Sequence, residues 1–105
     1  MTAPGERRRG TTSTTERRRA VRGAGDAARR AADGLAALVQ HRLEGVSAVR
    51  RGEDDGWIVN VDVLELARIP DTTSLLATYE VELDPAGELL QYRRIARYRR
   101  GAQDQ

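Results

Sequence analysis

The chain has 105 residues, enough for one small domain, and its 18 basic residues against 16 acidic ones give a net charge of +2. It contains no cysteine, which excludes disulfides and thiolate metal sites and fits a cytoplasmic protein. No apolar run approaches the roughly 18–20 residues that a membrane-spanning helix needs. Composition therefore predicts a single cytoplasmic domain that does not span a membrane.

The first quarter of the chain differs from the rest in charge. Residues 1–25 hold seven Arg against two Glu, a net charge of +5, whereas residues 26–105 hold eleven Arg against fourteen acids, a net charge of −3. Large apolar side chains are almost absent from residues 1–25, so this segment cannot bury enough surface to offset the entropy lost on ordering. We expect a disordered basic arm with arginine clusters at residues 7–9 and 17–19.

A helix is predicted to follow the arm. Asp26 is a plausible N-cap after two glycines, and Gly45 is well placed to end the helix. Between them the apolar residues recur at helical spacing, which predicts one buried stripe. The stripe consists of Ala28, Ala31, Ala32, Leu35, Leu38, Val39 and Leu43.

From residue 46 the apolar period changes to two, which is typical of strands. We predict strands over residues 46–51, 57–68, 75–83 and 88–98, separated by turns rich in Gly, Pro and Asp. The core-facing residues of the last strand are predicted to be Leu90, Tyr92, Ala96 and Tyr98. Sequential strands with short links favour an antiparallel meander.

The predicted fold is α+β, with one N-terminal helix packed on a small antiparallel sheet of three to four strands, preceded by the disordered arginine-rich arm. The domain is expected over residues 26–100, with a flexible polar tail over residues 101–105. On the sheet face away from the helix we expect charged side chains to pair, with Arg93 and Arg97 neutralising Glu80 and Glu82.

The residues that usually carry chemistry are sparse. His41 is the single histidine, and we interpret it as structural or solvated. Glu53, Asp54 and Asp55 lack the spacing of a calcium loop, and neither common phosphate-binding glycine pattern occurs. Trp57 opens a strand on its apolar side and is predicted to be a core residue. The sequence therefore predicts a binding protein without catalytic residues, metal or cofactor.

The last predicted strand is the most unusual stretch. Five arginines lie within residues 92–100, interspersed with two tyrosines, and both residue types are enriched at protein interfaces. If Arg93 and Arg97 pair within the sheet, Arg94, Arg99 and Arg100 remain for a partner. We take Arg94, Arg97, Tyr98, Arg99 and Arg100 as candidate partner-binding residues.

Several short elements, in this order and spacing, resemble the gas vesicle protein O family, in particular its actinobacterial members. The resemblance covers about residues 26–100 and leaves the arm outside. It rests on the Trp57 strand, Arg68-Ile69-Pro70-Asp71-Thr72, Leu76-Ala77-Thr78-Tyr79-Glu80-Val81, Leu83-Asp84, Gly87-Glu88-Leu89, Tyr92-Arg93 and Arg97-Tyr98.

The resemblance implies an accessory protein for gas vesicle assembly, acting with other accessory proteins and with the shell protein, in the cytoplasm or associated with vesicles. It implies no catalytic residue, and it adds Arg68 and Asp71 to the candidate partner-binding residues. We expect Arg68 to pair with Glu65, Asp71 or Glu80. Two alternatives remain open: a nucleic-acid-associated regulator that binds through the arm, and a ligand-binding or enzymatic α+β domain.

Overall fold

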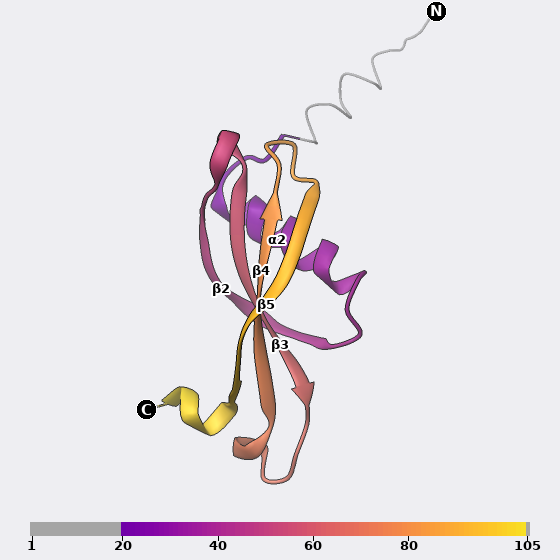
Figure 1. Cartoon of the computed structure of the whole chain (residues 1–105), viewed down its shortest axis with the longest axis vertical. Helices are drawn as coiled ribbons and strands as arrows, with labels where there is room; N and C mark the ends of the chain where they lie inside the picture. Colours follow the sequence, from indigo (N-terminus) through magenta and orange to yellow (C-terminus); the bar gives the residue numbers. More distant parts are fainter. Residues whose placement is uncertain (1–19, 105) are drawn as a thin grey trace, which may run out of the picture.

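The computed structural model describes residues 20–104, so the predicted disorder of the arm falls almost wholly outside the described residues. One helix packs on one face of a four-stranded antiparallel meander with strand order β2-β3-β4-β5, which confirms the predicted fold class (Figure 1). The elements are α2 (Ala24–Ala36), β2 (Arg42–Arg51), η1 (Glu53–Asp55), β3 (Trp57–Leu66), η2 (Asp71–Thr73), β4 (Leu75–Leu83), β5 (Leu89–Arg99) and η3 (Arg100–Asp104).

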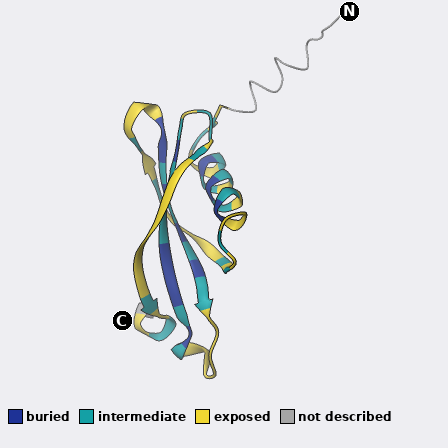
Figure 2. Ribbon diagram, turned by 45° about the vertical axis from the view of Figure 1, so that its right-hand side comes forward, coloured by how far each residue is buried: buried dark blue, intermediate teal, exposed yellow. Residues whose placement is uncertain are grey.

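The core lies between α2 and the two central strands. Alternating valines of β3 are fully buried, because every second residue of a strand faces the same side. The helix contributes Ala27, Ala31 and Leu35, whose four-residue spacing places them on one stripe. Figure 2 shows that α2 lies beside one half of the sheet, whereas most of β5 is exposed.

The helix is shorter than predicted. It begins at Ala24, so that Asp26 lies in the first turn and is not the N-cap, and it ends at Ala36. Val39 and Leu43 do pack against the core, but from a linker and from β2. These two side chains are therefore buried from an extended segment and not from a helix. Gly45, predicted to end the helix, lies inside β2.

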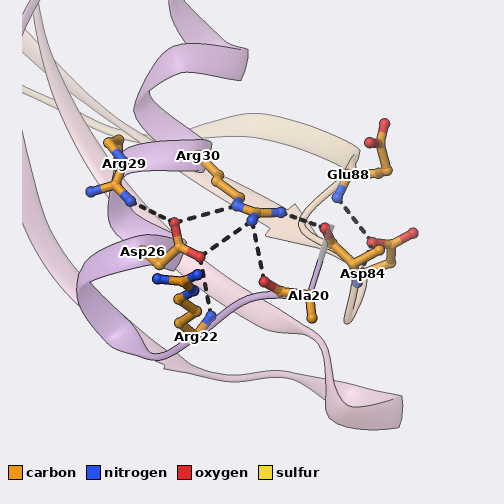
Figure 3. A network of polar contacts seen from close by, with 8 residues as sticks. Ala20, Arg22, Asp26, Arg29, Arg30, Asp84 and Glu88 are labelled. Atoms are coloured by element: carbon orange, nitrogen blue, oxygen red, sulfur yellow. Dashed lines mark hydrogen bonds and ion pairs between the residues drawn. The ribbon is translucent and has the colours of Figure 1, made fainter. Parts of the chain in front are cut away.

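A network of polar contacts fixes the start of α2 to the turn between β4 and β5 (Figure 3). The Arg30 guanidinium donates to the Ala86 carbonyl at 2.6 Å and pairs with Asp26. Asp26 also accepts a hydrogen bond from the Arg22 backbone amide, and this bond, with the nearby arginines, holds the pKa of its carboxyl below the usual value. The network determines where α2 crosses the sheet.

The last strand departs most from the prediction. Two bulges, at Leu90 and Ile95, interrupt its pairing with β4 and shift the side-chain alternation. Leu90 and Tyr92 are exposed instead of buried, and Leu89 packs against the core in their place. Residues 101–104, where a flexible tail was expected, belong to η3, and the Arg100 amide donates to the Ser74 carbonyl.

Candidate interaction surface

The β3–β4 loop and η3 lie at the same end of the sheet (Figure 1). Most of the candidate partner-binding residues belong to this end, and Arg94 lies nearer the middle of β5, opposite Tyr79. The candidate residues divide into two groups. Asp71, Tyr98 and Arg100 contact other parts of the chain and shape this end of the fold. The other four, Arg68, Arg94, Arg97 and Arg99, are all exposed and lie on the loop and on β5.

Arg100 joins three segments that are distant in sequence. Its Nη1 lies 3.0 Å from Glu44 Oε1 of β2, and its Nε lies 3.0 Å from Asp71 Oδ2 of η2. The second contact is an ion pair without hydrogen-bond geometry. The hydrogen bond that the guanidinium donates to Glu44, together with the Asp71 charge, raises the pKa of the guanidinium above its usual value. Arg100 thus stabilises the loop and the end of β5, and only part of its guanidinium remains accessible to a partner.

The β3–β4 loop is organised by a buried serine. Ser74 Oγ accepts a hydrogen bond from the Arg68 amide at 2.9 Å and donates to Asp71 Oδ1 at 3.1 Å. The prediction that the Arg68 side chain pairs with Glu65, Asp71 or Glu80 is wrong, because those carboxylates bind other arginines. The loop instead presents Ile69 with its side chain fully exposed.

Tyr98 lies on the sheet face away from the helix, in a polar hollow of about 170 Å³. Its phenol is near Thr78 and Asp62, and burial raises its pKa above the usual value. Thr78 Oγ1 donates to Asp62 Oδ1 at 2.6 Å. These contacts make Tyr98 part of the sheet surface and leave it half-buried.

On the same face, Glu80 bridges two strands. Arg50 of β2 and Arg93 of β5 lie 3.3 and 3.1 Å from its two oxygens. The hydrogen bond from Arg93, with that from Arg50, lowers the pKa of Glu80. The predicted pairing of Arg93 is thereby confirmed, but Glu82 accepts a hydrogen bond from Gln91 instead of from Arg97.

The helix side of the sheet carries a second charged cluster. Arg94 Nη1 lies 2.9 Å from Glu65 Oε2, and Arg97 Nε lies 3.0 Å from Glu65 Oε1. The two arginines extend from β5 across β4 to β3, and the β4 residue that pairs with Arg97, Ala77, is small. The Glu65 side chain is only 8% exposed, whereas both arginines remain about half-exposed. Arg99 lies two residues further along β5 and makes no ion pair within residues 20–104.

The sequence suggested Glu65 only as a possible partner of Arg68, and it gave no sign that Glu65 and its neighbour Leu66 lie beside the arginines of β5. A bulge at Glu65 shifts the β3–β4 register so that Leu66 pairs with Leu75, and Leu75 pairs with Arg99. Leu66 remains 46% exposed. We name the surface formed by Glu65, Leu66, Leu75, Arg94, Arg97 and Arg99 the basic corner. A local pattern could not have revealed it, because a bulge is not visible in hydropathy alternation.

The other residues considered for chemistry lie apart from the basic corner. Trp57 is a core residue as predicted, with the Arg51 guanidinium 4.2 Å from its ring centre. Glu53–Asp55 form the exposed turn η1, and His41 lies on the linker between α2 and β2. Within residues 20–104, no three His, Asp or Glu side chains are grouped to hold a metal ion. No helix in the same range is both long and apolar enough to cross a bilayer.

Comparison with known proteins identifies the family. The model of the family described as gas vesicle synthesis protein GvpO matches residues 10–104, which is most of the chain. The chain belongs to the GvpO family. The match includes the whole domain and the arginine cluster at residues 17–19, but not the cluster at residues 7–9. The predicted resemblance is thereby confirmed, and the family description connects the chain with gas vesicle synthesis.

Curated relatives carry the same name. The chain is 61% identical over 70 residues to gas vesicle protein O of Streptomyces sp. strain CB03234, covering 67% of this chain and 54% of the relative. It is 34% identical to gas vesicle protein O of Haloferax mediterranei, covering 75% of this chain and 56% of the relative. It is 36% identical to gas vesicle protein O1 of Halobacterium salinarum, covering 69% of this chain and 60% of the relative. The chain therefore spans little more than half the length of these relatives. No solved structure matches it.

Proposed function

We propose that this GvpO family member is an accessory factor of gas vesicle assembly that works in the cytoplasm or on vesicles by binding other proteins, without catalysis. Its partners would be other gas vesicle accessory proteins and the shell protein. Membership of a family described by gas vesicle synthesis supports the process.

The observation that carries the proposal is the exposure of β5. Nine of its eleven residues are exposed, and they include four arginines and the apolar side chains of Leu90 and Ile95. A mixture of guanidinium groups and apolar contact area is typical of protein interfaces. We propose that Arg68, Arg94, Arg97 and Arg99 contact the partner, while Asp71, Tyr98 and Arg100 hold the loop and the strand that present them.

Affinity capture tests this function directly. The full-length tagged chain is produced in cells that also make the complete set of gas vesicle proteins, and co-purifying proteins are quantified by mass spectrometry. We expect at least one other gas vesicle protein to be enriched over a tagged control domain of similar size and charge. Recovery of no gas vesicle protein above that control would contradict the proposal.

The arm supports a second candidate function. Its net charge of +5 and its arginine clusters suit phosphate binding, which would weaken steeply as salt is raised. A gel-shift assay with DNA and RNA at low salt compares the full chain with a chain lacking residues 1–19. Retardation that disappears with the arm would favour a nucleic-acid-associated role, and no retardation at low salt would exclude it.

A further inference from the structure

The helix layer is incomplete on its side of the sheet. The core beneath α2 and the following linker extends to Val63 and Ala77, which are fully buried. The next cross-strand row towards the β3–β4 loop consists of Leu66, Leu75 and Arg99, of which Leu66 and Arg99 are exposed (Figure 2). One face of a sheet in a two-layer fold is normally covered along its length. The basic corner is therefore where this layer stops.

The basic corner has an uncompensated positive charge. Two guanidinium groups, from Arg94 and Arg97, pair with the single carboxylate of Glu65, and a third arginine, Arg99, lies two residues further along β5. Arg94 uses Nη1 and Arg97 uses Nε in these ion pairs, so further N–H groups of both side chains remain to donate outward. The local excess of two positive charges favours an anionic partner.

Apolar side chains adjoin this charge. Leu66 is 46% exposed in the same cross-strand row as Arg99, and Ile69 is fully exposed on the loop that follows. A partner that satisfied only the arginines would leave these side chains in water. The occupant that fits both features has carboxylates and an apolar stripe.

The geometry favours binding on the face over strand addition at the edge. An added strand needs a continuous row of backbone donors and acceptors. The bulges at Leu90 and Ile95 divide β5 into short regular runs, and such interruptions disfavour edge pairing. The face beside α2 has no such restriction, and it already accepts one helix.

We propose that the basic corner binds an acidic amphipathic helix of a partner protein, which lies beside α2 as a second helix on the same sheet face. This proposal rests on the proposed function and specifies the chemistry of the partner. Carboxylates of the bound helix pair with the outward N–H groups of Arg94, Arg97 and Arg99. Its apolar stripe covers Leu66 and Leu75.

Two other occupants fit less well. A second copy of this chain would have to supply α2, but the exposed side of α2 carries both Arg29 and Asp33, so it is not acidic. Nucleic acid fits less well because none of the six residues of the basic corner is aromatic, so a base has no side chain there on which to stack.

The probe is a fluorescent synthetic helical peptide with a leucine stripe on one side and glutamates on the other, titrated into the full-length protein. We expect the double variant Arg97→Gln/Arg99→Gln to bind it about tenfold more weakly. This variant keeps Arg94 on Glu65, so the buried carboxylate stays paired. The matched control, Arg42→Gln/Arg50→Gln, loses the same charge from outside the corner, keeps Arg93 on Glu80, and should bind like the wild type.

Three further comparisons test the proposal. A scrambled peptide of the same composition without the stripe should bind more weakly, and equal binding would overturn the role of the apolar residues. Equal loss of affinity in both double variants would overturn the assignment to the basic corner. Self-association of the protein that blocks the peptide, or displacement of the peptide by an oligonucleotide at lower concentration than by unlabelled peptide, would overturn the choice of occupant. Circular dichroism confirms that each variant is folded.

The two proposals fail in distinguishable ways. If the wild type captures no gas vesicle protein from cells but binds the striped peptide through Arg97 and Arg99, the proposed function fails and the chemistry of the basic corner stands. If capture succeeds and is unchanged in Arg97→Gln/Arg99→Gln, the proposed function stands and the basic corner is not the binding surface.

Discussion

The two parts of the helix-side sheet face are built in different ways. Under α2, fully buried aliphatic side chains such as Leu35, Val59 and Val81 fill the space between the layers. In the basic corner, long arginine side chains lie over β4 and meet one carboxylate. Hydrophobic burial is the dominant stabilising term in folding, whereas ion pairs with half-exposed arginines contribute less. The difference indicates that the covered part maintains the fold and that the basic corner is free to serve binding.

The largest expected effect is in the covered part. Leu35→Ala removes a fully buried side chain at the centre of the contact between α2 and the sheet, and we expect the free energy of unfolding to fall by about 2–5 kcal/mol. Urea denaturation followed by circular dichroism measures it. Leu38→Ala, at a largely exposed position just after the helix, is the control and should change stability little. Similar losses in both variants would contradict the assignment of the core.

A smaller loss of unfolding free energy is expected when the most buried charge of the basic corner, that of Glu65, is removed. Glu65→Gln keeps the shape of the side chain but removes the charge that pairs with Arg94 and Arg97, and we expect a loss of about 2 kcal/mol in the same denaturation assay. Glu80→Gln also breaks a carboxylate bridge between two arginines, but at 21% exposure it should cost less. A larger loss for Glu80→Gln would show that burial does not determine the difference.

The attachment of α2 to the β4–β5 turn can be tested at a glycine. Gly87 has a φ of 92°, and a Cβ there would collide with the Arg30 guanidinium that donates to Ala86. Gly87→Ala should therefore lower the free energy of unfolding by about 1 kcal/mol. Gly45→Ala is the matched control, since an added Cβ at Gly45 meets no atom within 4 Å. If both substitutions lower the free energy of unfolding equally, the positive φ of Gly87 does not constrain which residue this turn accepts.

The smallest effect is a dependence on pH. The pKa of Glu80 in the folded protein lies below its ordinary value of 4.5, so its ion pairs stabilise the fold above that value. The stabilisation is lost as the pH falls through the lowered pKa, because the unfolded chain then binds a proton more readily than the folded one. Unfolding free energies measured from about pH 6 to about pH 3 should fall less steeply in Glu80→Gln than in the wild type. Parallel pH profiles for the wild type and Glu80→Gln would contradict the assignment of this pH dependence to Glu80.

The central strands could be predicted from sequence because their periodicity is uninterrupted. Trp57, Val59, Val61 and Val63 alternate with more polar residues, and all four are buried. The end of α2 could not be predicted in this way. Leu38, Val39 and Leu43 continue the helical spacing by chance, and the chain reaches the sheet as a linker and a strand. Spacing shows which residues are apolar but not which backbone conformation buries them.

The basic corner was predicted only in part, for a related reason. The arginines of β5 were visible as a charge cluster, but their partners were not. Strict alternation placed Ala96 and Tyr98 on the core face, but the bulge at Ile95 moves them to the opposite face, where they pair with Thr78 and Leu76. Glu65 lies 29 residues before Arg94, and only the folded sheet brings the two together. Ion pairs between distant strands follow from register, and here register depends on bulges at both ends of the contact.

The bulges of β5 also bear on how this protein behaves when it is concentrated. The strand pairs with β4 without interruption only over residues 91–94 and 96–99, four residues in each run. Segments that stack into amyloid-like fibrils typically need six or seven regular residues and little net charge. A long, exposed outer strand thus remains a poor template for fibril growth.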